Sequence, residues 1–137
     1  MESQVKKYEF LEHPSELKIR SFGKDLSEVF VNSALAMMEF LFDKVPKNKI
    51  QYERIEVEAN NLESLLVDWL ADILYLSNSK KRIYLDFKVL EFSDHKIVAD
   101  VGSQKALAKD DIKAVTYHEL SINKQNDLWQ ATVVYDI

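Results

Sequence analysis

The sequence predicts an α+β fold, in which a mixed or mainly antiparallel sheet packs with two amphipathic helices. Two segments repeat apolar residues at the spacing of one helix face, and several others alternate apolar and polar residues as strands do. Each helix must bury its apolar side against a sheet face or against the other helix. The 137 residues have the size of one domain and contain no visible linker, so we expect a single domain over residues 1–137.

The first two strands are expected over residues 8–11 and 17–22, with a bend between them. Pro14 interrupts the strand pattern, because proline lacks an amide donor and disfavours helical geometry in the residue before it. His13 and Glu16 are therefore expected in the bend.

The two helices are expected to begin after Asp25 and Asn61. Both residues are favourable N-caps, and Glu28 adds a capping-box-like pair three residues after Asp25. The first helix should end near Asp43. The apolar face of the second helix continues for three turns and consists of Leu62, Leu65, Leu66, Trp69, Leu70, Ile73 and Leu74.

Further strands are expected over residues 50–59, 85–89 and 97–101. The basic run 80–82 follows the second helix, where the helix dipole favours cations. Residues 102–111 are polar and are expected to form a loop.

A C-terminal hairpin is expected from residues 112–122 and 128–137. Both segments alternate apolar and polar residues, and the polar residues 123–127 separate them. The hairpin would be the last element of the fold.

The register of this hairpin follows from the position assumed for its turn. With the turn centred between Lys124 and Gln125, Asp136 lies opposite Lys113, at a Cβ separation of about 4.5–5.5 Å. One end of the hairpin would then carry Lys113, Asp136 and the α-carboxylate of Ile137.

Composition narrows the class of protein. The chain has 18 Lys and Arg against 23 Asp and Glu, a net charge of −5, which favours a cation or a basic protein surface over nucleic acid as the direct partner. It has no cysteine, which excludes a disulfide framework, a zinc ribbon and a thiol nucleophile. Residues 1–7 lack the apolar run of a signal peptide, and no stretch approaches the roughly 20 apolar residues that span a bilayer. We expect a soluble cytoplasmic protein without a membrane partner.

Common catalytic and cofactor motifs are absent from the sequence. The two glycines cannot form a GxGxxG motif or a P-loop, and no nucleophile elbow is present. His13, His95 and His118 lie far apart and show no zinc-binding spacing. The chemistry that remains is the bend at one end of the chain and the charged groups at the other.

These positions carry a resemblance to the archease family. Residues 8–13, Tyr-Glu-Phe-Leu-Glu-His, resemble the family's opening strand and the start of its His-Thr-Ala-Asp bend. Residues 112–118, Ile-Lys-Ala-Val-Thr-Tyr-His, are similar to its most recognisable motif, and Asp136-Ile137 is similar to its final pair. The resemblance covers the whole chain as a single archease-like domain.

The resemblance implies a protein that activates the RtcB-type RNA ligase of tRNA splicing. Such a protein promotes guanylylation and multiple turnover of the ligase, is not itself an enzyme, and meets tRNA only through the ligase. The resemblance also implies a divalent metal (Ca²⁺, Mg²⁺ or Mn²⁺) held by Glu16, Asp136 and Ile137, and an activating role for Lys113. His13 and His118 are candidate supporting residues. The sequence does not specify an oligomeric state.

The bend departs from the family pattern. Glu16 replaces the family's Asp and Pro14 its Thr. Glutamate is still a hard oxygen donor that Ca²⁺, Mg²⁺ or Mn²⁺ accepts, but its carboxylate lies one methylene further out. The alternative is that Glu16 is a solvated turn residue and Asp136 a neighbour of Lys113.

Two other functions remain open from the sequence. One is a small metal-dependent phosphoester hydrolase that uses His13, Glu16 and Asp136. The other is a generic chaperone-like protein-interaction domain.

Overall fold

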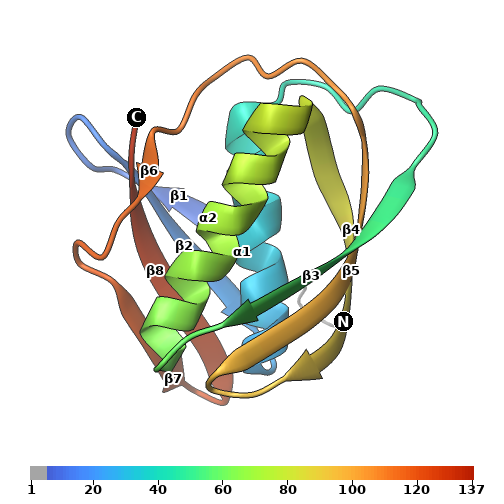
Figure 1. The fold of residues 1–137 in the computed structure, drawn as a ribbon. Coiled ribbons are helices and arrows are strands. Elements are labelled where there is room, and N and C mark those ends of the chain that lie inside the picture. Colours follow the sequence, from blue (N-terminus) through green and yellow to red (C-terminus); the bar gives the residue numbers. More distant parts are fainter. Residues whose placement is uncertain (1–5) are drawn as a thin grey trace, which may run out of the picture.

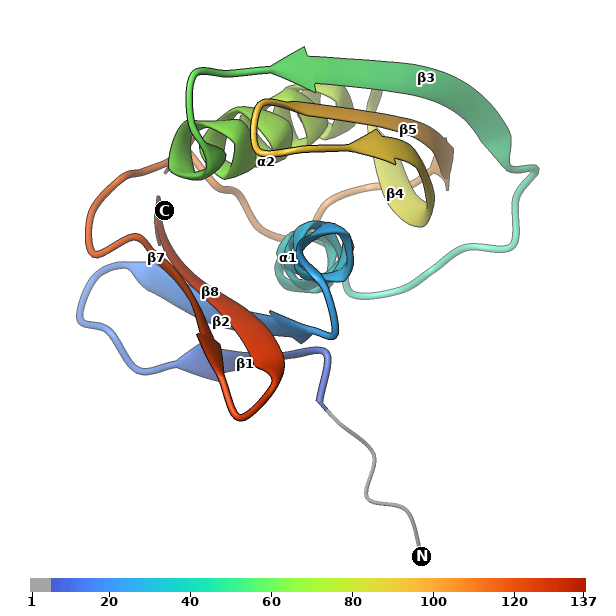
Figure 2. The same cartoon turned by 90° about the horizontal axis from the view of Figure 1, so that it is seen from below.

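The computed structural model describes residues 6–137, which form two helices and eight strands in two sheets (Figure 1). Both helices lie between the sheets, with α1 near the centre and α2 beside the smaller sheet (Figure 2). Strand pairing is antiparallel throughout the described range. The α+β fold class is therefore confirmed, with two sheets where a single one was expected.

The first sheet joins the two ends of the described chain. Its strand order is β1 (Tyr8–Leu11), β2 (Leu17–Gly23), β8 (Leu128–Asp136) and β6 (Ala114–Val115), and β7 (Ser121–Gln125) also pairs with β8. The strands β2 and β8 pair from Leu17↔Tyr135 to Gly23↔Trp129. The strand β8 is thus flanked on both sides, and its side chains from Ala131 to Tyr135 are buried.

The second sheet is smaller and covers the other side of the helices. Its order is β3 (Gln51–Glu58), β5 (Lys96–Lys105) and β4 (Arg82–Phe92). The register of β4 shifts twice against β5, between Tyr84 and Asp86 and between Val89 and Glu91. Such bulges bend and twist a strand locally.

Both helices start where the sequence predicts. The helix α1 spans Leu26–Leu41 and α2 spans Leu62–Lys80. The side chain of Asp25 accepts a hydrogen bond from the Glu28 amide at 2.9 Å, and that of Asn61 accepts one from the Ser64 amide at 2.8 Å. Each cap satisfies an amide that would otherwise lack a helical partner.

The two helices meet in the core through Trp69. This side chain is fully buried, and its indole Nε1 donates to the Phe30 carbonyl oxygen at 3.0 Å. The ring also packs edge-on against Phe87 of β4, with centroids 6.0 Å apart. A single side chain therefore ties α2 to α1 and to the second sheet.

The predicted register of the C-terminal hairpin is wrong. The strands β7 and β8 pair at Lys124↔Trp129 and are joined by Asn126 and Asp127, with φ of 51° and 62°. Positive φ at both residues is the signature of a type I′ turn, whose twist matches that of the paired strands. The turn is therefore centred two residues later than the sequence analysis assumed.

The single strand expected over residues 112–122 is also wrong. It divides into β6 and β7, which pair with β8 in different registers: Ala114↔Asp136 in β6 and Ser121↔Thr132 in β7. The residues between them leave the sheet in a turn, with the Leu120 amide donating to the Tyr117 carbonyl at 3.2 Å and Glu119 at φ 53°. Apolar and polar residues continue to alternate through this turn, so the sequence pattern does not reveal that the strand is interrupted.

At the second sheet one expectation needs correction and another holds in part, since Lys80 lies in the last turn of α2, where the helix dipole favours a cation, whereas Arg82 begins β4. The strand β5 continues to Lys105, into the segment expected to be a loop. Arg82 of the basic run is buried, and its guanidinium donates to Ser103 Oγ at 2.7 Å and to the Ser103 carbonyl at 3.0 Å. Hydrogen bonds across the sheet, rather than solvent, therefore satisfy this cation.

None of the helices within residues 6–137 combines the length and apolar character needed to cross a bilayer. The N-terminal segment, residues 1–7, was expected to carry no signal peptide. Its residues 1–5 lie outside the described residues.

Candidate functional site

The bend between β1 and β2 is a tight turn that brings His13 and Glu16 together. The Glu16 amide donates to the His13 carbonyl at 3.4 Å, which closes a four-residue turn. Pro14 occupies its second position and Ser15 its third, with φ 63°. Proline followed by a residue of positive φ is the pattern of a type II turn. Because the first and fourth residues of a turn are neighbours, His13 Nδ1 lies 3.2 Å from Glu16 Oε1.

The loop between β6 and β7 faces this bend and is anchored by Thr116. The Thr116 hydroxyl donates to the Val134 carbonyl at 2.7 Å and accepts from the His118 amide at 3.2 Å. The first bond holds the loop on β8, and the second fixes the start of the turn that contains His118 and Glu119. Both of these side chains are exposed.

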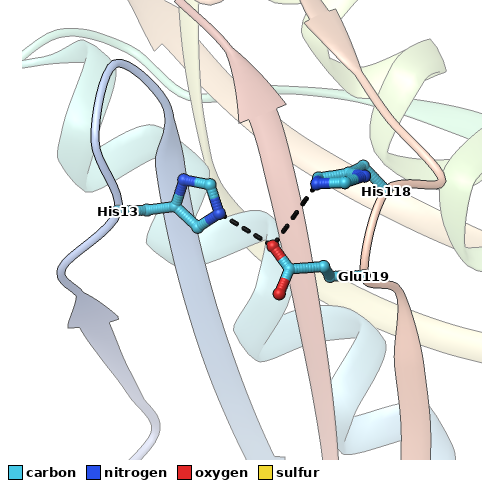
Figure 3. Close-up of side chains that lie close together, drawn as sticks. All are labelled: His13, His118 and Glu119. Carbon is cyan, nitrogen blue, oxygen red and sulfur yellow. Dashed lines mark hydrogen bonds and ion pairs between the residues drawn. The ribbon is translucent and has the colours of Figure 1, made fainter.

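The two segments converge on the carboxylate of Glu119 (Figure 3). Its Oε2 lies 2.8 Å from His13 Nε2 and 3.5 Å from His118 Nε2. Its other oxygen, Oε1, lies 3.5 Å from Lys18 Nζ. We call His13, His118 and Glu119 the imidazole–carboxylate cluster.

The charges in this cluster support one another. The hydrogen bond to Glu119 raises the pKa of His13 above its usual value, although burial opposes the shift. The same hydrogen bond, together with Lys18, lowers the pKa of Glu119. His13 is thus favoured as a cation and Glu119 as an anion. His13 Nδ1 is buried and, despite the nearby Glu16 carboxylate, lacks an aligned hydrogen bond, so this contact is electrostatic.

The predicted carboxylate site lies at the same end of the first sheet. Leu17↔Tyr135 is the last pair between β2 and β8, so Glu16 and Asp136 follow at adjacent positions of the register. Both views show the end of the chain beside the β1–β2 bend (Figures 1 and 2). The expected meeting of the bend and the end of the chain is therefore present in the backbone. Asp136 and Ile137 are exposed, whereas Glu16 is partly buried.

Lys113 does not pair with Asp136 as the sequence analysis expected. Asp136 faces Ala114 across β6, one residue away from the predicted partner. A slip of one residue sends a side chain to the opposite face of a strand. The two residues are still joined through the backbone, where the Lys113 amide donates to the Asp136 carbonyl at 2.7 Å. Within residues 6–137, no ion pair links their side chains.

Two kinds of metal donor are thus present at this end of the molecule. The side chains of Glu16 and Asp136 carry carboxylate oxygens, a type of donor that suits hard cations such as Ca²⁺, Mg²⁺ or Mn²⁺, and follow each other in the register of β2 and β8. The imidazole–carboxylate cluster offers two ring nitrogens and one oxygen, all within 4.8 Å of one another. Glu119, and Lys18 beside it, were not among the site residues predicted from the sequence.

A separate hollow lies away from this end of the sheet. It has a volume of about 660 Å³ and is lined by residues that include Lys44, Pro46, Lys80, Lys105 and Leu107. It shares no residue with the imidazole–carboxylate cluster or with the carboxylate site.

Comparison with known proteins agrees with the resemblance noted in the sequence. The sequence matches the model of the Archease protein family (MTH1598/TM1083) over residues 8–137. Protein archease of Methanosarcina barkeri is 38% identical over 146 residues, which cover 100% of both chains. Protein archease of Pyrococcus furiosus is 34% identical and covers 97% of this chain and 100% of its own.

Solved structures share the fold. The solution structure of Methanobacterium thermoautotrophicum protein 1598 matches with a TM-score of 0.72 and 29% identity, covering 97% of this chain and 100% of that one. A crystal structure from Thermotoga maritima, described as an archease and possible chaperone, matches with a TM-score of 0.63 and 20% identity, covering 100% of both chains. From the matched sequence model and the similarity of its relatives along their whole length, this chain belongs to the archease family.

Proposed function

We propose that this protein activates an RtcB-type RNA ligase of tRNA splicing, promoting its guanylylation and multiple turnover without being an enzyme itself. The observation that carries the proposal is the family match over residues 8–137, which includes the motif at residues 112–118. The partner is a protein, and tRNA is met only through it. The net charge of −5 supports this choice, because a direct nucleic-acid binder needs an excess of basic side chains.

The proposed metal ligands are Glu16, Asp136 and the Ile137 carboxylate. The register between β2 and β8 supports the set, because it brings the first two residues to neighbouring positions at one sheet end. A bound Ca²⁺, Mg²⁺ or Mn²⁺ would neutralise these carboxylates and hold them in one arrangement. The longer side chain of Glu16 reaches further than the family's Asp, so the ion would lie further from the bend.

Lys113 is proposed as the residue that acts on the ligase. It is exposed at the edge of the first sheet, where it can meet a carboxylate of the ligase or a phosphate of the nucleotide. Its backbone bond to Asp136 ties its position to the carboxylate site. Metal binding there would therefore also steady the segment that carries Lys113.

A guanylylation assay tests the proposal. The protein is mixed with the ligase from the same organism and labelled GTP, and the label transferred to the ligase is followed over time. Wild-type protein should accelerate transfer, Lys113→Ala should not, and Lys109→Ala should behave as wild type. Lys109 is a matched control, because it is an exposed lysine in the preceding loop, beside Asp110. No acceleration by the wild type, or equal acceleration by Lys113→Ala, would overturn the proposal.

The same preparations discriminate the two alternatives. The contact of His13 with Glu16 is the observation that favours a metal-dependent phosphoester hydrolase. Turnover of a phosphoester by the isolated protein with Mn²⁺, abolished by Glu16→Gln, would establish that function. A chaperone-like role predicts binding of unrelated unfolded proteins as well as of the ligase.

A further inference from the structure

The structure brings together two histidines that are 105 residues apart in the sequence. We propose that His13 Nε2, His118 Nε2 and Glu119 Oε2 form a Zn²⁺ site separate from the carboxylate site. The proposal rests on the convergence of the β1–β2 bend and the β6–β7 loop on one carboxylate oxygen (Figure 3). It goes beyond the proposed activation of a ligase and does not depend on it.

The distances are close to those of a zinc centre. Zinc binds histidine nitrogen and carboxylate oxygen at about 2.0–2.2 Å, so donors in a tetrahedral site stand roughly 3.4 Å apart. Here the Glu119 oxygen lies 2.8 Å from one imidazole nitrogen and 3.5 Å from the other. The two nitrogens lie within 4.8 Å of each other. Rotating these side chains so that their donor atoms move by about an ångström would bring all three donors to bonding distance from one ion.

The surroundings orient the donors for this role. A histidine that binds a metal through one nitrogen commonly directs its other N–H to a carboxylate. His13 comes close to this arrangement, since Nδ1 is buried and lies 3.2 Å from Glu16 Oε1, although the two atoms do not form an aligned hydrogen bond. On the opposite side, Lys18 attracts Glu119 Oε1, which leaves Oε2 turned toward both imidazoles. Each carboxylate oxygen thus has its own partner.

The backbone that carries the donors is fixed in advance. Ser15 in the bend and Glu119 in the loop have φ of 63° and 53°, a backbone conformation that residues other than glycine seldom adopt. The tight turn of the bend and the Thr116 hydroxyl bond to β8 hold these two segments in place. Donors that are already positioned lose little conformational entropy when an ion binds.

The donor set selects the kind of metal. Imidazole nitrogen is a ligand typical of zinc and other transition metals, whereas Ca²⁺ and Mg²⁺ prefer oxygen alone. Three protein donors leave the fourth tetrahedral position open to water or to a side chain of a partner. Binding would release to solvent the proton that His13 Nε2 shares with Glu119, and would cross-link the bend to the loop and so stabilise the folded state.

Titration of the metal-free protein with Zn²⁺, measured by calorimetry, tests the proposal. The protein is used without a histidine tag, and each variant is checked for folding by circular dichroism. Wild type should bind one Zn²⁺ per chain, and at a free Zn²⁺ concentration 100 times the Kd the Tm should rise by roughly 10 °C. Excess Ca²⁺ should not displace the ion. Substitution with Co²⁺ should give the visible absorption of a tetrahedral centre.

The variants separate this site from its surroundings. His118→Ala and Glu119→Gln should each weaken Zn²⁺ binding by at least about 100-fold, because each removes a direct ligand, and loss of an outer-shell partner alone costs about 10–100-fold. Both residues are exposed, so these changes spare the core. His95→Ala is the matched control, an exposed histidine in the β4–β5 turn, and should bind as wild type. Asp136→Asn should also retain Zn²⁺.

Three results would overturn the proposal. They are absence of micromolar binding by the wild type, equal binding by His118→Ala and Glu119→Gln, or loss of binding in Asp136→Asn. The last would assign the ion to the carboxylate site. Since no ligase is present, failure of the proposed activation would leave all these measurements unchanged.

Discussion

The two glycines of the chain offer a matched test of how closely its elements pack. Gly23 lies where β2 gives way to the cap of α1. A Cβ added there would stand 2.7 Å from the Val29 amide nitrogen, 2.9 Å from Glu28 Cβ and 3.0 Å from the Asp25 carbonyl oxygen. Non-bonded carbon contacts are ordinarily about 3.5–4.0 Å. Because two of the three atoms belong to the backbone, Gly23→Ala must displace the first turn of α1.

Gly102 serves as the control, because its neighbours can move. An added Cβ there would meet Tyr52 Cε1 at 2.8 Å, Ile50 Cγ2 at 3.0 Å and Asp86 Cβ at 3.1 Å. The two nearest are side-chain atoms of exposed residues that can move, at the cost of the bond from the Tyr52 hydroxyl to Asp86, while Asp86 Cβ has to give by only a few tenths of an ångström. Neither glycine has a positive φ, so alanine fits the backbone at both positions. By restricting the unfolded chain, each alanine should by itself raise the free energy of unfolding by about 0.4–1 kcal/mol.

The net effects should differ clearly. Overpacking costs about 1–3 kcal/mol, so Gly23→Ala should lower the free energy of unfolding by about 2 kcal/mol. Gly102→Ala should stay within about 1 kcal/mol of wild type. Urea unfolding followed by circular dichroism measures both, and the midpoint for Gly23→Ala should fall by roughly 1 M at an unchanged m-value. A Gly23→Ala protein as stable as wild type, or a Gly102→Ala protein equally destabilised, would refute this reasoning.

Three further predictions concern the core and the caps. Trp69→Phe should destabilise by about 2–3 kcal/mol in urea, because it leaves a void and removes the bond to the Phe30 carbonyl; a loss below about 1 kcal/mol would contradict the buried bond. Asp25→Ala should cost about 1 kcal/mol at neutral pH. The Glu28 amide lowers the pKa of Asp25, so the difference from wild type should be full above about pH 4 and shrink as the pH falls through the lowered value. Burial raises the pKa of Tyr84 to about 12. The tyrosinate absorbance of Tyr84, isolated by comparison with Tyr84→Phe, should therefore appear near pH 12. The stability that the folded protein gains from neutral Tyr84 should decline from about pH 10 upward.

The helices were predictable because their signals are local. Asp25 and Asn61 each cap a helix through an amide three residues away. The apolar face of α2 is a periodicity within one segment, and most of that face is buried. Signals of this kind can be read without knowing where the rest of the chain lies.

The hairpin register was not predictable from the same pattern. Alternation shows that a segment is extended, but the backbone angles of its turn decide which residues face each other. Asn126 and Asp127 both adopt the left-handed conformation, and this choice moves the turn along the chain. The turn at Glu119 then separates β6 from β7, and Asp136 comes to face Ala114 instead of Lys113.

The candidate site shows the same division between local and long-range information. The neighbourhood of His13 and Glu16 follows from a turn that Pro14 helps to define. Glu119 joins them only because β8 pairs with β2 along all of β2 and the β6–β7 loop folds back toward the bend. A solvent-exposed glutamate among 23 acidic residues carries no sequence signal of that role.

The central place of β8 in the first sheet also constrains how the protein is made on the ribosome. The strands β1 and β2 emerge early, but the neighbour that completes their sheet spans residues 128–136. The second sheet and both helices can begin to assemble before then, whereas β2 keeps an unpaired edge until residues 129–135 have been translated. Closure of the first sheet is therefore a late event of long sequence separation, and nascent chains that stall before residue 128 should be the ones that aggregate.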